Sequence, residues 1–253
     1  MKRYFKGLYM SFGMFCSIPL PFNIWDNTCM NLVLAYFPVI GAVTGILWFS
    51  AAMLLYASSI HIMIITAVLT LFPFLITGFL HLDGYMDTSD AVLSRKPLED
   101  KLRILKDPHI GAFGVIMFGV LLVIQFACLY AIAEKEKYPE LFITIPIISR
   151  SCSTISIFCL KTLSQSGYAI MLKQNTGKAH RAFVIITAIT GIILSYIFAG
   201  FPGLITAVSV IAGFTAAMAY AYNNLKGVSG DLAGFSLVTA ELCGLIAMAI
   251  IIG

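Results

Sequence analysis

Long, nearly uncharged apolar runs are the feature that most constrains how this 253-residue chain can fold. Hydrophobic residues make up 60% of the sequence and charged residues only 11%. A soluble domain carries roughly 25% charged residues, so this chain has too few charges to cover a water-facing surface. The composition therefore excludes the soluble classes and predicts an all-α, polytopic integral membrane bundle.

About seven stretches are long and apolar enough to cross a bilayer, which takes roughly 20 residues in a helix. Polar or proline-containing breaks separate them, among them Ala57-Ser58-Ser59 and the predicted tight turn Phe201-Pro202-Gly203. No repeat or linker divides the chain, so residues 1–253 are expected to form a single membrane-embedded domain. The predicted spans are 32–56, 58–80, 110–133, 140–160, 182–200, 203–222 and 232–252.

Lysine and arginine indicate the orientation of these spans, because cytosolic loops carry most of them. They gather at the N-terminus, in 81–109, in 161–181 and at Lys226, whereas 57–59 and 201–202 carry none. The pattern predicts a protein of the cell (cytoplasmic or inner) membrane whose N-terminus lies in the cytosol. The net charge of +4 is small and divided among these clusters, so no nucleic-acid partner is expected.

The N-terminal stretch resembles a signal peptide in having Lys2, Arg3 and Lys6 before apolar residues. Pro19 and Pro21 interrupt that stretch, and no small-residue cleavage site follows. Residues 1–30 are therefore predicted to remain as an interfacial segment on the bilayer surface.

The densest polar signal lies at the predicted cytosolic end of the second span, at the start of segment 81–109. On a helix, about 100° per residue places Asp83, Asp87 and Asp90 within an arc of roughly 60°. Such carboxylates repel each other, and a divalent cation such as Mg²⁺ would convert the repulsion into coordination. A solvated helix end is the plain alternative. His81 falls away from this arc, which makes it a candidate proton carrier rather than a metal ligand.

Two further polar segments border apolar runs on the same predicted membrane face. In the first, Lys106 and Asp107 precede Gly111 and Gly114, where a turn feeding a helix N-terminus would suit phosphate. An ordinary capped turn explains that segment equally well. The second runs from Gly227 through Gly230 to Asp231, where glycines allow close approach of a ligand. Helix capping by Asp231 is the alternative there.

Two charges lie inside predicted spans, Arg150 and Glu241. A charge at the bilayer centre is costly, so such residues are usually functional or paired. Their similar depth predicts an Arg150–Glu241 pair, with a structural role and a substrate contact both open.

Together, the polar segments on one face indicate a single cytosol-facing site for a phosphate-bearing substrate, with a metal neutralising the reacting centre.

At these positions the sequence resembles the cobalamin synthases, the adenosylcobinamide-GDP ribazoletransferases of the cobamide pathway. The resemblance covers nearly the whole chain and rests on several blocks in order. These are Phe37-Pro38 with Gly41 and Gly45; Gly78-Phe79-Leu80-His81-Leu82-Asp83-Gly84 with Asp87 and Asp90; Lys106-Asp107 with Gly111 and Gly114; Ser149-Arg150; and Gly227 through Gly234 with Glu241.

The resemblance implies that α-ribazole, or its 5′-phosphate, attacks the diphosphate of adenosylcobinamide-GDP. Adenosylcobalamin, or its 5′-phosphate, forms and GMP leaves, with Mg²⁺ required. Asp83, Asp87 or His81 would act as the catalytic base, and Asp83, Asp87, Asp90 and Asp107 would hold the metal. Substrate would be contacted by Lys106, Gly111, Gly114, Arg150, Gly227, Gly230, Asp231 and Glu241. A homo-oligomer, or an association with other enzymes of the pathway, is left open.

The sequence departs from the family pattern at two places. Cys16-Ser17 stands where many relatives have Thr-Arg, and Val238 stands where a glutamate is common. Two other functions would each explain part of the sequence. A CDP-alcohol phosphotransferase also binds metal through aspartates, but its Asp-Gly-x-x-Ala-Arg core is missing after Asp83-Gly84. An ion-coupled transporter would explain Arg150 and Glu241, but the paired halves typical of transporters are absent from the sequence.

Overall fold

The computed structural model describes residues 2–22, 24–163, 167–173 and 176–252, and it is helical almost throughout. Within those residues the one β-pairing is an isolated bridge between Thr162 and Val228. The helices are α1 (Lys2–Phe15), the 3₁₀ turn η1 (Asn27–Cys29), α2 (Met30–Ala35), α3 (Phe37–Tyr56), α4 (Ile62–Ile76), α5 (Leu80–Leu93), α6 (Leu98–Ile104), α7 (Ala112–Lys135), α8 (Leu141–Cys159), α9 (Gly167–Lys173), α10 (Lys178–Ala199), α11 (Phe201–Leu225) and α12 (Gly230–Ile252).

The predicted polytopic bundle is confirmed. In the described part of the chain, six helices are long and apolar enough to span a membrane: α3, α7, α8, α10, α11 and α12. The pair α4–α5 makes a seventh span if it is counted as one broken helix, because the two are bent by 92°. Some predicted bounds differ: the first span is divided at Tyr36 into α2 and α3, and the second ends at Ile76.

The predicted turn at Phe201-Pro202-Gly203 is wrong by a few residues. The chain turns at Gly200, whose φ is 60°, and Phe201 already begins α11. Pro202 lies in the first turn of that helix, where its missing N–H has no partner to lose.

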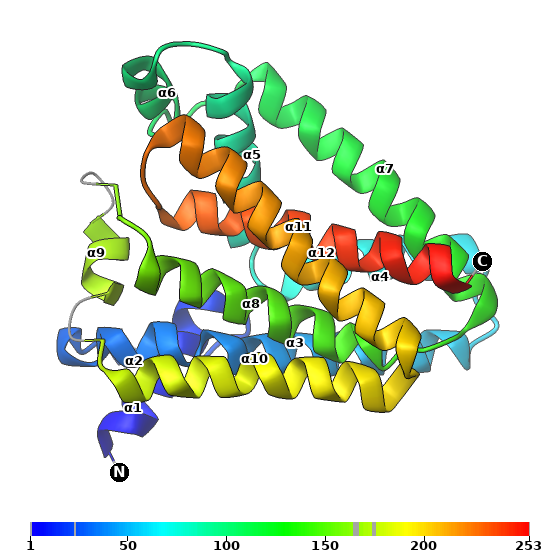
Figure 1. The fold of residues 1–253 in the computed structure, drawn as a ribbon. Helices are drawn as coiled ribbons and strands as arrows, with labels where there is room; N and C mark the ends of the chain where they lie inside the picture. The colour runs from blue at the N-terminus through cyan, green and yellow to red at the C-terminus, as the bar shows by residue number, and fades with distance from the viewer. Residues whose placement is uncertain (1, 23, 164–166, 174–175, 253) are drawn as a thin grey trace.

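α8 and α12 form the centre of the bundle (Figure 1). α8 packs against α3, α10, α11 and α12, and 83% of its apolar stretch is buried inside the protein, against 22% for α10. The serines and threonines of α8 are consistent with this burial, since small polar side chains allow close helix packing in a membrane. The polar side chains of α8 therefore face other helices.

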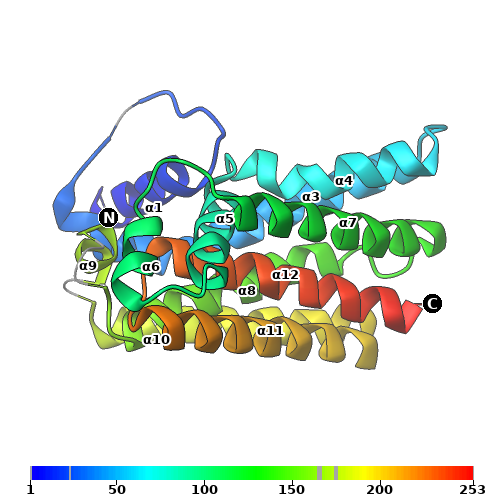
Figure 2. The same ribbon diagram turned by 90° about the horizontal axis from the view of Figure 1, so that it is seen from above.

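The ends of the bundle differ in charge. Figure 2 shows the N-terminus, α1, α6 and α9 at one end, and the C-terminus with the α3–α4, α7–α8 and α10–α11 connections at the other. The first end, called the basic end below, carries the N-terminal cluster, the lysines and arginines of α6 and its flanks, and Lys161, Lys173, Lys178, Arg181 and Lys226. The structure thus gathers at one end the basic segments that the sequence assigns to the cytosol. Residues 164–166 and 174–175 of the 161–181 loop lie outside the described residues.

The bend between α4 and α5 separates the aspartate-bearing helix from the second span. Gly78 and Phe79 both take left-handed backbone conformations, with φ of 60° and 61°. The carbonyls at the end of α4 are satisfied by the segment after α1: Ser17 N donates to Ile76 O (2.7 Å) and Ser17 Oγ to Leu75 O (2.6 Å). Since exposed carbonyls are costly in a bilayer, Ser17 contributes to holding this bend.

Glycines bring α3 and α8 into backbone contact. A Cβ at Gly41 would lie 2.5 Å from Pro146 O, and one at Gly45 would lie 2.6 Å from Ile143 O. The Gly-x-x-x-Gly spacing presents both glycines on one face, as in close helix pairs of membrane proteins. Any side chain at Gly45 would therefore separate the helices.

We expect Gly45→Val to lower the thermal unfolding midpoint in detergent, because overpacking a tight helix contact costs about 1–3 kcal/mol. Gly119→Val on α7 is the matched control, since nothing lies within 4 Å of its Cβ position. Equal midpoints for the two variants would contradict the close α3–α8 contact.

Candidate functional site

The candidate site begins where α5 crosses the start of α12. A Cβ at Gly84 would lie 2.8 Å from Asp231 Cα, and one at Gly234 would lie 3.1 Å from His81 O. Only glycine permits backbones to approach this closely. The two glycines therefore bring Asp231 of α12 beside the aspartates of α5.

Asp83, Asp87 and Asp231 form an acidic cluster without compensating cations. Asp83 is exposed and the other two are half-buried. The carboxylate of Asp87 is repelled by the negative charges of three other aspartates, which are, in decreasing order of effect, Asp83, Asp231 and Asp90. Among the described residues, no ion pair involves Asp83, Asp87 or Asp231. No ion pair of the described residues therefore offsets the repulsion between these carboxylates, and a bound cation could do so.

The side chain of Ser229 takes the capping role at the start of α12 that the sequence left open for Asp231. Leu232 N donates to Ser229 Oγ (3.3 Å), so Ser229 caps α12. Ser229 Oγ also lies 3.2 Å from Asp231 Oδ2 and donates to it. The carboxylate of Asp231 is thus oriented by Ser229 and by the backbone N–H of Asp231 itself.

Asp90 and its neighbouring glycines make a helix junction. Phe113 N and Gly114 N donate to Asp90 Oδ1 at 3.2 and 3.4 Å, so the carboxylate caps α7. A Cβ at Gly111 would overlap this carboxyl group, and one at Gly114 would lie 3.0 Å from Met86 O. Two N–H groups at the turn predicted to receive phosphate, those of Phe113 and Gly114, therefore already bind Asp90.

Asp107 also has a local partner. His109 N donates to Asp107 Oδ1 (3.0 Å), and the ring Nδ1 of His109 lies 2.7 Å from the same oxygen. These hydrogen bonds hold the pKa of Asp107 below its usual value. Both residues are exposed, and neither lines the cavity described next.

A cavity of about 520 Å³ joins the predicted polar segments. Asp83 and His81 reach it from α5, Lys106 from the segment after α6, and Gly230 and Asp231 from the start of α12. Lys101 Nζ donates to Asn224 Oδ1 (2.7 Å) and so ties α6, which precedes Lys106, to the end of α11. Acidic groups, a lysine and a helix N-terminus therefore line one opening near the basic end.

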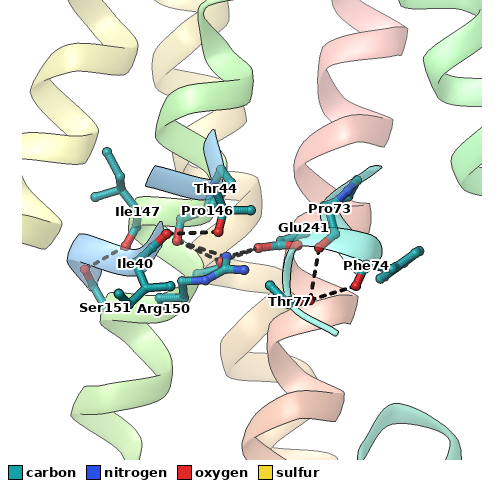
Figure 3. A network of polar contacts seen from close by, with 11 residues as sticks. Ile40, Thr44, Pro73, Phe74, Thr77, Pro146, Ile147, Arg150, Ser151 and Glu241 are labelled. Carbon is teal, nitrogen blue, oxygen red and sulfur yellow. Dashed lines mark hydrogen bonds and ion pairs between the residues drawn. The ribbon is translucent and has the colours of Figure 1, made fainter. Parts of the chain in front are cut away.

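Arg150 and Glu241 form the predicted pair in the bundle centre. Arg150 Nη1 lies 2.6 Å from Glu241 Oε1, and Ser149 Oγ donates to the same oxygen at 2.8 Å. Figure 3 shows the pair between α8 and α12, with Thr44 of α3 close by. The side chains are 1% and 11% exposed and do not line the cavity, so a substrate contact by either stays a prediction.

Gly227 and Gly230 have different surroundings. A Cβ at Gly227 would lie 2.7 Å from Leu163 Cδ2, so Gly227 packs against the segment after α8. Gly230 has nothing within 4 Å of its Cβ position and lines the cavity. Of these two predicted substrate contacts, Gly230 is the one beside open space.

The described residues contain no group of three or more His, Cys, Asp or Glu side chains arranged to hold a metal ion. Mg²⁺, however, usually takes one or two carboxylates and completes its shell with water and substrate phosphate. Two carboxylates drawn from Asp83, Asp87 and Asp231 would meet that requirement, because these acids interact electrostatically and form no ion pair among the described residues. Asp90 and Asp107 are already engaged by hydrogen bonds.

Most of the apolar wall of the cavity had no signal in the sequence. Phe37 of α3 belongs to the Phe37-Pro38 block, but the other residues come from α1, α2, α8 and α9, carry no motif and meet only in the folded bundle: Met14, Phe15, Leu34, Ile157 and Leu172.

Residues 7–249 match the model of the cobalamin-5-phosphate synthase family. Curated relatives named adenosylcobinamide-GDP ribazoletransferase include one from Clostridium botulinum (strain Eklund 17B / Type B), 37% identical over 97% of both chains. Another, from Clostridium perfringens (strain SM101 / Type A), is 35% identical over 99% of this chain and 100% of the relative. No solved structure matches the chain.

We expect Glu241→Ala to destabilise the protein strongly, because it leaves the Arg150 guanidinium buried and unpaired, at a cost of about 3–5 kcal/mol. Thermal unfolding in detergent measures the effect, with the exposed Glu99→Ala as control. The double change Arg150→Met with Glu241→Leu should restore part of the loss. An unfolding midpoint of Glu241→Ala equal to that of the wild type would refute the structural role of the pair.

Proposed function

We propose a reaction for this chain on the premise that it belongs to the cobalamin-5-phosphate synthase family. It is a multi-pass membrane protein and a transferase of cobalamin biosynthesis. In the proposed reaction, a hydroxyl oxygen of α-ribazole, or of its 5′-phosphate, attacks the corrinoid-side phosphorus of adenosylcobinamide-GDP. The P–O bond to GMP breaks, and adenosylcobalamin or its 5′-phosphate forms.

The observation that carries the proposal is the cavity shared by Asp83, Lys106 and Asp231. Phosphoryl transfer depends chiefly on positioning and on neutralising negative charge. Lys106 supplies a cation, and the N-terminus of α12 at Gly230 presents backbone N–H groups to a phosphate oxygen. The proton of the attacking hydroxyl would pass to an aspartate of α5 or to His81.

We propose that carboxylates of the cluster formed by Asp83, Asp87 and Asp231, contributed by both α5 and α12, hold Mg²⁺ together with the diphosphate. When bound, the ion would neutralise charge on the phosphate oxygens. The uncompensated acidic cluster supports this assignment. It leaves Asp90 to cap α7 and Asp107 to bind His109.

We further propose that the site faces the cytosol across the inner membrane. The cavity opens near the end of the bundle that gathers the N-terminal cluster and the basic residues of α6 and its flanks. By the positive-inside tendency that end is cytosolic. The nucleotide-bearing substrate would then reach the site from the compartment where nucleotides are made.

We expect purified protein in liposomes to convert adenosylcobinamide-GDP and α-ribazole to a cobamide with stoichiometric GMP, only with Mg²⁺. Asp83→Asn and Asp87→Asn should each lower kcat/KM by at least about a hundredfold, the scale for removing one electrostatic group that stabilises a transition state.

The matched control is Asp100→Asn, because Asp100 lies on α6 and, within the part of the chain that the structure describes, forms its ion pair with the exposed Arg103. Full activity in both active-site variants would refute the metal assignment. Flux of a substrate across sealed liposomes without GMP release would instead support a transporter.

A further inference from the structure

The cavity is lined by apolar residues as well as by charged ones, and this apolar part of its lining is called the chamber below. Phe15 of α1 and Phe37 of α3 line it, with ring centroids 4.3 Å apart. The ring of Phe37 lies edge-on to His81 at 5.4 Å, and Arg150 Cζ lies 5.7 Å from its centroid. Contacts on several sides hold this aromatic wall in place. A flat aromatic group is the chemistry that such a wall suits.

His81 adds a polar group to this wall. Its side chain lines the cavity and is only 7% exposed, and its Nε2 has no hydrogen-bond partner. A buried polar atom without a partner is costly, so native structures usually supply one. The unpartnered nitrogen is therefore a place where a ligand can complete a hydrogen bond.

The size of the cavity indicates which of the two proposed substrates can fit inside it. At about 520 Å³ it lies within the range that encloses a drug-sized molecule, such as a nucleoside. A corrin macrocycle with its amide side chains and attached nucleotide is several times larger than a nucleoside. The chamber can thus enclose the acceptor, whereas the corrinoid has to remain outside the opening.

We infer that the chamber binds the heteroaromatic base of the acceptor nucleoside, with the His81 Nε2–H group donating to the unsubstituted ring nitrogen of that base. This assignment rests on the proposed function and adds to it the place of the acceptor and a residue that recognises its base. The ribose then lies toward Asp83 and Lys106, where its hydroxyl meets the donor diphosphate and passes its proton to an aspartate of α5 rather than to His81.

The test compares α-ribazole with the analogue in which a CH group replaces the unsubstituted ring nitrogen. We expect the wild type to favour α-ribazole by at least about tenfold in kcat/KM, because a site built to hydrogen-bond a substrate rejects the analogue that lacks the partner. His81→Phe keeps an aromatic ring but removes the donor, so its ratio should fall toward one. An unchanged ratio in His81→Phe, or no preference in the wild type, would overturn the inference.

Equilibrium binding of both nucleosides by calorimetry, with no donor substrate present, covers the case in which His81→Phe has lost turnover. The same fall in preference should appear in the ratio of dissociation constants, and an unchanged ratio would again overturn the inference. A purely structural histidine would weaken binding of both nucleosides alike.

The chamber wall provides a second, independent pair of variants on α8. Ile157 lines the cavity, whereas Ile145 is buried in the core outside it. Ile157→Ala should raise KM for α-ribazole by about tenfold with little change in kcat, since one missing contact in an apolar pocket is worth roughly 10–200-fold. Ile145→Ala should leave KM unchanged. Equal effects of the two variants on KM would place the base elsewhere. Wild-type protein that makes no cobamide would refute the proposed function itself.

Discussion

The close approach of α5 to α12 is the constraint on which the candidate site depends. Gly84 meets the backbone of Asp231, and Gly234 meets that of His81. Within a bilayer no hydrophobic force drives helices together, so packing through small residues and polar contacts holds them. Here that packing has a chemical consequence, because it sets carboxylates from two distant segments around one opening.

Backbone polar groups explain the structural roles of Ser17 and of Asp90, which the sequence singled out as a metal ligand. The bend at Gly78 and Phe79 frees carbonyls of α4, and Ser17 satisfies two of them. Asp90 does the same for N–H groups at the start of α7. Since such groups are costly to leave unpaired near lipid, part of the polar inventory of this chain stabilises the irregular segments that shape the cavity.

Periodicity and charge predicted the helical class, the polytopic bundle and the grouping of basic segments, because hydropathy and loop charge are local properties. The Arg150–Glu241 pair was also predictable, since two buried charges at similar depth need each other. The 92° bend after Ile76, the capping role of Asp90 and the apolar wall with Phe15 were not. Each depends on contacts between segments far apart in the chain, which no window of sequence contains.

Binding of Mn²⁺, a paramagnetic substitute for Mg²⁺, tests the central claim that α12 completes the acidic site begun by α5. Electron paramagnetic resonance would follow Mn²⁺ binding to the purified protein with adenosylcobinamide-GDP present. We expect Asp231→Asn to weaken Mn²⁺ binding by at least about tenfold, because a carboxylate ligand is lost. Unchanged Mn²⁺ affinity in Asp231→Asn would show that the metal does not lie between these helices.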